Sequence, residues 1–294
     1  MLHLKFRRIA TQVYSSVQAS GDYLGYPPSF PRSSAASPFV LVNDRTGKQI
    51  KLQPCRGRGI EPGPGILHYP WVGFDCGGAK PYRIYNIVTH KWHSLGCNAC
   101  KRHPYLVDMT AIGADWVGLS VAPHQACGDG IHGTCGPTTY LYENVVTGAS
   151  RTPRLRAGSV VDLDSPSLTS RLCKPLQVPQ GTGGFPNPFT FFGRYTLAFS
   201  RSGIYVERCG SRLHLPLIVG SNDFTSFGNT KAVGACNRRT STGAAPTLQG
   251  VFLPSLRRYQ VDMPSNIGCP QSIALGPHHI AVTSGLSLWV AAFP

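Results

Sequence analysis

The chain has 294 residues, a net charge of +15 and 41% hydrophobic residues, so it is long and apolar enough to bury a core and is not a disordered segment. Only 14% of its residues are charged, whereas glycine (33) and proline (25) are frequent. No stretch shows sustained helical periodicity or about 18 consecutive apolar residues, which excludes a helical bundle and a transmembrane helix and favours an all-β, loop-rich domain.

Two short phrases recur along the chain. An aromatic or polar pair leads a short apolar strand in residues 22–26, 70–74 and 115–119. The pattern Asn-x-x-Thr followed by Gly or His comes after each copy, in residues 43–47, 86–90 and 144–148. Asn and Gly tolerate the left-handed backbone of tight hairpin turns, so the second phrase predicts a turn between two strands. Two hairpins per repeated unit are typical of a β-propeller blade.

These units predict one all-β domain, residues 1–294, folded as a six-bladed β-propeller of four-stranded antiparallel blades. The chain starts with an orphan strand, residues 3–9, and its last unit has a single outer strand near residues 286–293. Pairing of the two would complete the last blade and close the ring without an open sheet edge. The expected blades are 11–52, 53–97, 98–155, 185–217, 218–264, and 265–294 together with 3–9.

Residues 156–184 fit none of these units. They are an irregular linker or insertion, or they hide a degenerate seventh blade. Gln180-Gly181-Thr182-Gly183-Gly184 and several prolines argue against strand pairing, so we favour a linker.

One segment resembles a known family. Residues 197–206, Leu-Ala-Phe-Ser-Arg-Ser-Gly-Ile-Tyr-Val, resemble the repeat core of TolB-like six-bladed propellers, and the Asn/Asp-x-x-Thr-Gly hairpins look like those of secreted bacterial propellers of that type. The acidic residue of the Ser-x-Asp-Gly turn is absent, since residues 200–203 read Ser-Arg-Ser-Gly. The resemblance therefore implies the architecture and no functional residue. Propellers of this class are more often binding platforms than enzymes, although fold alone does not decide function.

Ten cysteines lie in loops beside glycine and proline, which favours disulfides and an extracellular or cell-envelope location. The N-terminal residues lack the apolar core of a signal peptide, so this location requires a signal that the chain does not show. The blade topology places several of these loops on one face. The expected pairs are Cys55–Cys76, Cys97–Cys100, Cys127–Cys135, Cys236–Cys269 and, by elimination, Cys173–Cys209.

Two cysteine loops also allow other chemistry. Cys97-x-x-Cys100 followed by His103 has metal-like spacing, but no second such pair exists, so we expect a disulfide and no metal. Within Cys127–Cys135, Asp129 and His132 suggest an acid–base pair or metal ligands, yet no nucleophile or third ligand is evident. A disulfide-closed, glycine-rich turn is the favoured interpretation.

In a four-stranded blade, the loops between the second and third strands emerge on the same face as the loops between blades. Here these loops are long and rich in basic residues, which favours function on this face. The candidate ligand-binding residues are Arg56, Arg58, Lys101, Arg102, Arg238 and Arg239. Such a surface suits an anionic polymer, or a protein partner, and carries no specific nucleic-acid motif.

Common catalytic signatures are absent, including Gly-x-Ser-x-Gly, the P-loop and His-Glu-x-x-His. We therefore expect no catalytic residue and no cofactor, and a monomeric, non-catalytic binding or scaffold propeller. The alternative is a carbohydrate-active hydrolase or lyase with acids at the central channel, for which Asp162, Asp164 and Asp223 are the best candidates. A purely structural domain is the third possibility. Acids that converge on the channel mouth would favour an enzyme.

Overall fold

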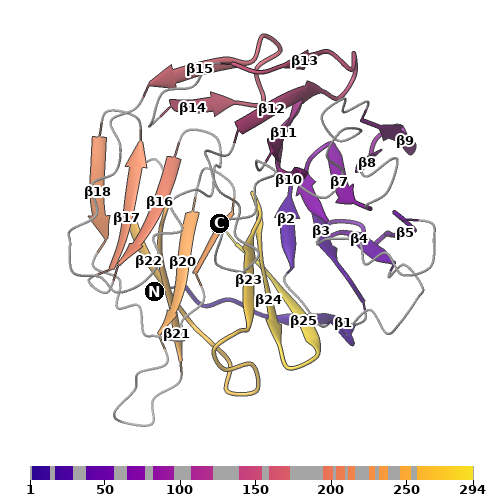
Figure 1. Ribbon diagram of the computed structural model, residues 1–294. Helices are drawn as coiled ribbons and strands as arrows, with labels where there is room; N and C mark the ends of the chain where they lie inside the picture. The colour runs from indigo at the N-terminus through magenta and orange to yellow at the C-terminus, as the bar shows by residue number, and fades with distance from the viewer. Residues whose placement is uncertain are drawn as a thin grey trace, which may run out of the picture.

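The computed structural model describes residues 2–13, 17–28, 38–55, 65–76, 82–95, 107–121, 139–153, 159–172, 195–200, 203–208, 211–215, 225–228, 232–237, 246–252 and 257–293. Within these ranges the chain forms β-strands, turns and bends, and contains no helix that could cross a membrane. Figure 1 shows the strands gathered into separate sheets arranged around a centre.

The first three blades are four-stranded antiparallel sheets in simple up-and-down order. The first blade contains β2 (Gln18–Ser20), β3 (Tyr23–Tyr26), β4 (Phe39–Asn43) and β5 (Gln49–Leu52). The second contains β6 (Ile66–His68), β7 (Trp71–Asp75), β8 (Tyr82–Asn86) and β9 (Lys91–Ser94). The third contains β10 (Val107–Ile112), β11 (Trp116–Val121), β12 (Thr139–Asn144) and β13 (Ser150–Arg151).

Three further sheets of three or four strands follow in the second half of the chain. One is three-stranded, with β16 (Tyr195–Ser200), β17 (Gly203–Arg208) and β18 (Ser211–Leu215). The next contains β19 (Thr225–Gly228), β20 (Ala232–Asn237), β21 (Thr247–Phe252) and β22 (Arg257–Asp262). The last blade contains β23 (Ser272–Leu275), β24 (His279–Ser284), β25 (Ser287–Ala292) and, at its outer edge, β1 (Arg7–Thr11). The all-β propeller fold is confirmed.

The N-terminal strand completes the last blade as predicted. It pairs antiparallel with β25, from Arg7 opposite Val290 to Thr11 opposite Ser287. The strand starts later than the predicted residues 3–9, because the residues before it pack against a hydrophobic cluster and do not pair with β25. Leu2, Leu4 and Phe6 pack against the hydrophobic cluster that joins the last blade to β22.

The segment 156–184 differs from the favoured linker. It contains a two-stranded hairpin of β14 (Ser159–Asp162) and β15 (Thr169–Leu172). In Figure 1 this hairpin lies at the top, beyond the end of the third blade and before β16–β18. Pro166 lies in the β14–β15 turn, where it interrupts neither strand, and Gln180–Gly184 and the other prolines follow the hairpin in the sequence. A seventh sheet is therefore present among the described residues.

The repeated Asn-x-x-Thr turns form for a local reason. In the third blade, Asn144 Oδ1 accepts hydrogen bonds from the backbone amides of Val146 (3.1 Å) and Thr147 (2.8 Å). Gly148 then adopts a left-handed φ of 69°, as Gly47 does at 72° in the first blade. The side chain of Asn43 or Asn86 accepts the same pair of amide hydrogen bonds in its own blade. The Asn-x-x-Thr sequences thus form the hairpin turns predicted for them.

The hydrophobic core lies between neighbouring blades. Trp71, Tyr82 and Ile84 of the second blade pack in one buried cluster with Val117 and Leu119 of the third. Comparable clusters join the first blade to the second and the last blade to the first. Each sheet therefore depends on its neighbours for burial, and the ring positions loops from different blades relative to one another.

Candidate functional site

The strand order divides the connections between two faces. The short-turn face carries the connections β2–β3, β4–β5, β6–β7, β8–β9, β10–β11 and β12–β13. The loop face carries the connections between the second and third strands and between successive blades, such as β3–β4 and β5–β6. Because all strands of a blade are antiparallel, the two sets of connections emerge at opposite ends of the sheets.

The base of the loop face is cross-linked between the first two blades. Cys55, which follows β5, forms a disulfide with Cys76, which follows β7, and their Cα atoms are 5.2 Å apart. Both cysteines are buried. This is the pair expected from the shared face of their loops. The cross-link fixes the chain immediately before Arg56, where the predicted basic loop begins.

Arg83 of β8 reinforces this base. Its guanidinium donates a hydrogen bond to the carbonyl oxygen of Pro54, and it stacks 4.2 Å from the ring centre of Trp92 in β9. A stacked and hydrogen-bonded guanidinium loses much of its freedom to rotate. The chain just after β5, the start of β8 and the outer strand β9 are thereby held together.

The following lie outside the described residues: Arg56, Arg58, Lys101, Arg102, Arg238, Arg239, Cys97, Cys100, Cys127, Cys135, Cys173 and Cys209. Cys269 is disulfide-bonded, whereas the side chain of its expected partner, Cys236, is not among those described. His103, Asp129, His132 and Asp223 also lie outside the described residues.

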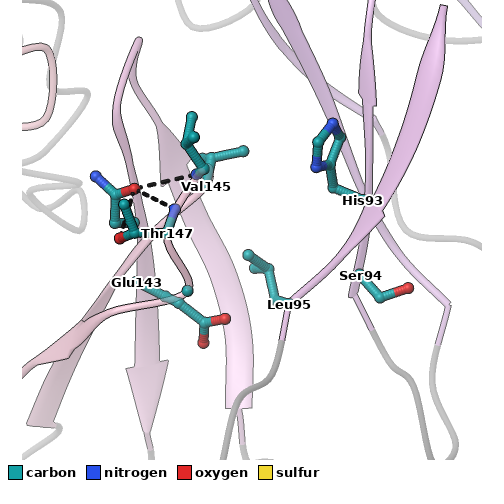
Figure 2. Close-up of a pocket in the computed structure, with 9 residues that line it drawn as sticks. His93, Ser94, Leu95, Glu143, Val145 and Thr147 are labelled. Atoms are coloured by element: carbon teal, nitrogen blue, oxygen red, sulfur yellow. Dashed lines mark hydrogen bonds between the residues drawn. The ribbon is translucent and has the colours of Figure 1, made fainter.

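A pocket of about 330 Å³ lies between the second and third blades (Figure 2). His93, Ser94 and Leu95, at the end of β9, form one side. Residues 143–148, from the end of β12 and the turn after it, form the other. Figure 2 shows the Glu143 carboxylate and Leu95 across the gap from each other.

The pocket combines a carboxylate, a hydroxyl and an imidazole. Glu143 is only 1% exposed, and the His93 ring packs edge-on against Trp71 with centroids 5.3 Å apart. This contact with Trp71 of the blade core fixes the orientation of the His93 ring. The pocket lies between two blades, and its Ser94 side adjoins the cross-linked loop base, because Ser94 pairs in register with Arg83. Sequence reasoning missed this pocket, because it read Asn144–Gly148 as a turn and nothing more.

The short-turn face holds a second group of polar residues. Asp164, in the β14–β15 turn, lies 2.9 Å from His68 Nε2 at the end of β6, and its Oδ1 also accepts a hydrogen bond from the Ala114 amide at 2.8 Å. The hydrogen bond from His68 is the main reason that the pKa of Asp164 lies below its usual value; burial opposes it. Asp162 Oδ1 accepts from the Asp164 amide at 3.0 Å. Two of the three acids singled out from the sequence are thus placed here.

Aromatic rings flank this group. Tyr69, next to His68, is 43% exposed and stacks on Tyr23 of the first blade, with ring centroids 6.1 Å apart and planes inclined by 13°. Parts of the first three blades and the β14–β15 hairpin therefore contact one another at the short turns. Among the described residues, no group of three or more His, Cys, Asp or Glu side chains is arranged to hold a metal ion.

Comparison with known proteins supports the fold and goes no further. No protein-family model and no curated protein matches the sequence. PorZ, a bacterial surface component of the type-IX secretion system of Porphyromonas gingivalis, is similar in structure with a TM-score of 0.53 at 10% identity, over 98% of this chain and 39% of PorZ.

Two other solved structures are more distant. A prolyl endopeptidase matches with a TM-score of 0.40 at 12% identity, over 94% of this chain and 40% of that one. Regucalcin from Agrobacterium tumefaciens matches with a TM-score of 0.43 at 8% identity, over 99% and 95% of the two chains. These neighbours are β-propeller proteins. The chain spans about 40% of the length of the prolyl endopeptidase it matches.

Proposed function

We propose that this chain is a non-catalytic binding propeller of the TolB-like type, secreted or exposed on the cell envelope and monomeric. Its ligand is an anionic polymer, or an acidic surface of a protein partner, bound on the loop face by Arg56, Arg58, Lys101, Arg102, Arg238 and Arg239. The observation that carries the proposal is the Cys55–Cys76 cross-link at the base of the first basic loop.

The cross-link supports binding through entropy. Binding to a loose loop costs free energy, because backbone and side chains must be ordered. A disulfide immediately before Arg56, together with the hydrogen bond from Arg83 to Pro54, fixes one end of that loop before any ligand arrives. The disulfide also fits an oxidising compartment, where such bonds persist. The net charge of +15 favours a polyanion as partner.

The surroundings of Asp164 support binding over glycoside hydrolysis. A glycosidase needs a carboxylic acid that stays protonated near neutral pH, which requires a raised pKa. Asp164 is the singled-out acid with a defined partner, and His68 lowers its pKa. It lies on the short-turn face, opposite the long loops. The Asp164 carboxylate is therefore suited to pair with a cationic group and is not suited to donate a proton.

The proposal is tested with charge-reversal variants and a matched control. Arg56→Glu/Arg58→Glu and Arg238→Glu/Arg239→Glu should each weaken binding to heparin and to teichoic acid at low salt, by at least tenfold. Lys48→Glu/Lys91→Glu changes the net charge equally at two exposed lysines of the outer hairpins, and should have a smaller effect. Wild-type binding should fall steeply with salt, because exposed charges are screened within about 10 Å at 0.1 M.

Equal binding by the wild type and both arginine variants at low salt would overturn the proposal. Equal loss in the lysine control would show that only net charge matters and that the loop face is not a site. Thermal melts should coincide for all variants, since exposed charges contribute little to folding.

A further inference from the structure

The last and first blades meet at a buried contact between a histidine and an aspartate. His279 is the first residue of β24 in the last blade, and Asp44 lies in the turn between β4 and β5 of the first blade. His279 Nδ1 and Asp44 Oδ2 are 2.5 Å apart, and the two side chains are only 3% and 10% exposed. The other described ion pairs, Arg45–Asp22 and His68–Asp164, are much more exposed.

The seam between the last and first blades is apolar and buried. The seam between the last and first blades consists of Val13, Val17, Leu24, Tyr26, Val40, Val42, Ala274, Ala281, Leu288 and Val290. The His279 ring lies against Gly276 so closely that an added Cβ there would fall 2.4 Å from Nε2. Among the described residues, His279 Nδ1, His279 Nε2 and Asp44 Oδ1 all lack a hydrogen-bond partner.

Charged and titratable groups around the pair come from four segments of the chain. Asp22, in the β2–β3 turn, accepts the Asp44 amide through its carbonyl oxygen and pairs with Arg45 at 3.5 Å. Arg7 of β1 donates to the Asp44 carbonyl oxygen at 3.2 Å. His278 precedes His279 in the chain. Burial and His278 lower the pKa of His279, Asp44 and Asp22 raise it, and burial is the largest influence, so the pKa lies below 6.5.

We propose that the His279–Asp44 contact is a pH-sensitive latch, which holds the last blade against the first at neutral pH and loosens this seam in mild acid. At neutral pH the uncharged imidazole carries its proton on Nδ1, the nitrogen that lies 2.5 Å from Asp44 Oδ2. A second proton must go to Nε2, which has no acceptor and is buried beside Gly276. A buried, unsolvated charge is costly, whereas an opened seam lets water hydrate the imidazolium.

The sign of the effect follows from linkage. The open form binds a proton with the ordinary pKa of about 6.5, and the closed form binds it less readily. The closed seam is therefore fully stable above pH 6.5 and loses stability as the pH falls through 6.5 toward the lower pKa of the closed form. One proton changes the opening equilibrium by at most about tenfold per pH unit.

Hydrogen–deuterium exchange on the full chain at pH 7.5 and 5.5, corrected for intrinsic exchange rates, tests the latch. We expect peptides that cover β25 and the β4–β5 hairpin to lose protection at pH 5.5, up to about tenfold. Peptides that cover β8 and β9 should not change. In His279→Asn, whose amide replaces the imidazole beside Asp44 without titrating, the seam should show no such change. The control His68→Asn, at an imidazole one third exposed, should behave like the wild type.

Equal seam protection at both pH values in the wild type, or the same loss in His279→Asn, would overturn the proposal. If His279→Asn does not fold, NMR titration of the wild-type imidazole gives a second test. The latch requires His279 to titrate below 6.5, together with the loss of seam protection. Titration at or above 6.5 contradicts it.

Discussion

The indole Nε1 of Trp116 donates a hydrogen bond to the carbonyl oxygen of Pro166, 3.2 Å away. One blade earlier, Trp71 Nε1 makes the same kind of bond to Ala114, at 2.7 Å. Each tryptophan begins the second strand of its blade, and Ala114 belongs to the inner turn of the next blade. The β14–β15 turn thus packs against the third blade in the same way as the β10–β11 turn of the third blade packs against the second blade. The hairpin occupies a blade position in the ring.

Gly113 tests the contact between the third blade and this hairpin. A Cβ at position 113 would lie 2.5 Å from the backbone carbonyl carbon and oxygen of Leu163, and backbone cannot move aside cheaply. We expect Gly113→Ala to lower the free energy of unfolding by about 1–3 kcal/mol, as overpacking does. Urea denaturation measures it.

Gly118, in β11 of the same blade, provides the matched control. Its added Cβ would meet the nearest atom at 3.5 Å, which is ordinary contact. Gly118→Ala should stay within about 0.5 kcal/mol of the wild type. If both variants lose the same stability, the hairpin does not press on Gly113.

The blades were predictable because their signals are local. Asn144 and Thr147 form a turn within five residues, and this phrase recurs at fixed places in the first three blades. The β14–β15 hairpin has no such phrase. Its turn is held by Trp116 and by the Ala114 amide, which are distant in the sequence. The local sequence pattern of this segment therefore favoured a linker, whereas contacts with residues distant in the sequence stabilise a hairpin there.

The candidate sites also differ in how far the sequence predicts their contacts. Cys55–Cys76 followed from topology, because both loops emerge on one face of adjacent blades. Asp164 was singled out as an acid, but its partner His68 belongs to the second blade, and nothing in either segment indicates the other. Side-chain pairing between blades depends on the angle at which neighbouring sheets pack, which residue spacing does not encode.

Asn144 should determine the stability of the third blade's outer turn. Its side chain accepts two amide hydrogen bonds and one from the Thr147 hydroxyl. Asn144→Ala leaves these donors without their acceptor, so we expect a loss of about 1–2 kcal/mol in urea denaturation. Asn144→Asp keeps an acceptor oxygen and should lose less. Val146→Ala, at a turn tip that is 69% exposed, should be close to neutral, and a comparable loss there would argue against this role.

Removal of the Cys55–Cys76 cross-link should weaken both stability and binding. The two cysteines are separated by 21 residues, and closing a loop of this size in the unfolded chain contributes about 3 kcal/mol. We expect Cys55→Ala/Cys76→Ala to lose about that much in chemical denaturation. Its affinity for heparin should also fall, because the loop that starts at residue 56 is then anchored less firmly. A loss of stability with unchanged affinity would limit the disulfide to a folding role.

The His68–Asp164 pair should make stability depend on acid pH. The pKa of Asp164 is lower in the folded protein than the ordinary 3.8, chiefly because His68 donates a hydrogen bond to it. The stabilisation is therefore complete above pH 3.8 and disappears as the pH falls through the lower folded value. His68→Ala should reduce this acid-dependent loss in urea titrations between about pH 6 and 2. His68→Gln offers an uncharged donor in its place and should retain most of it, since the hydrogen bond lowers the pKa more than charge does. Parallel curves for the wild type and His68→Ala would show that the pair contributes nothing to stability.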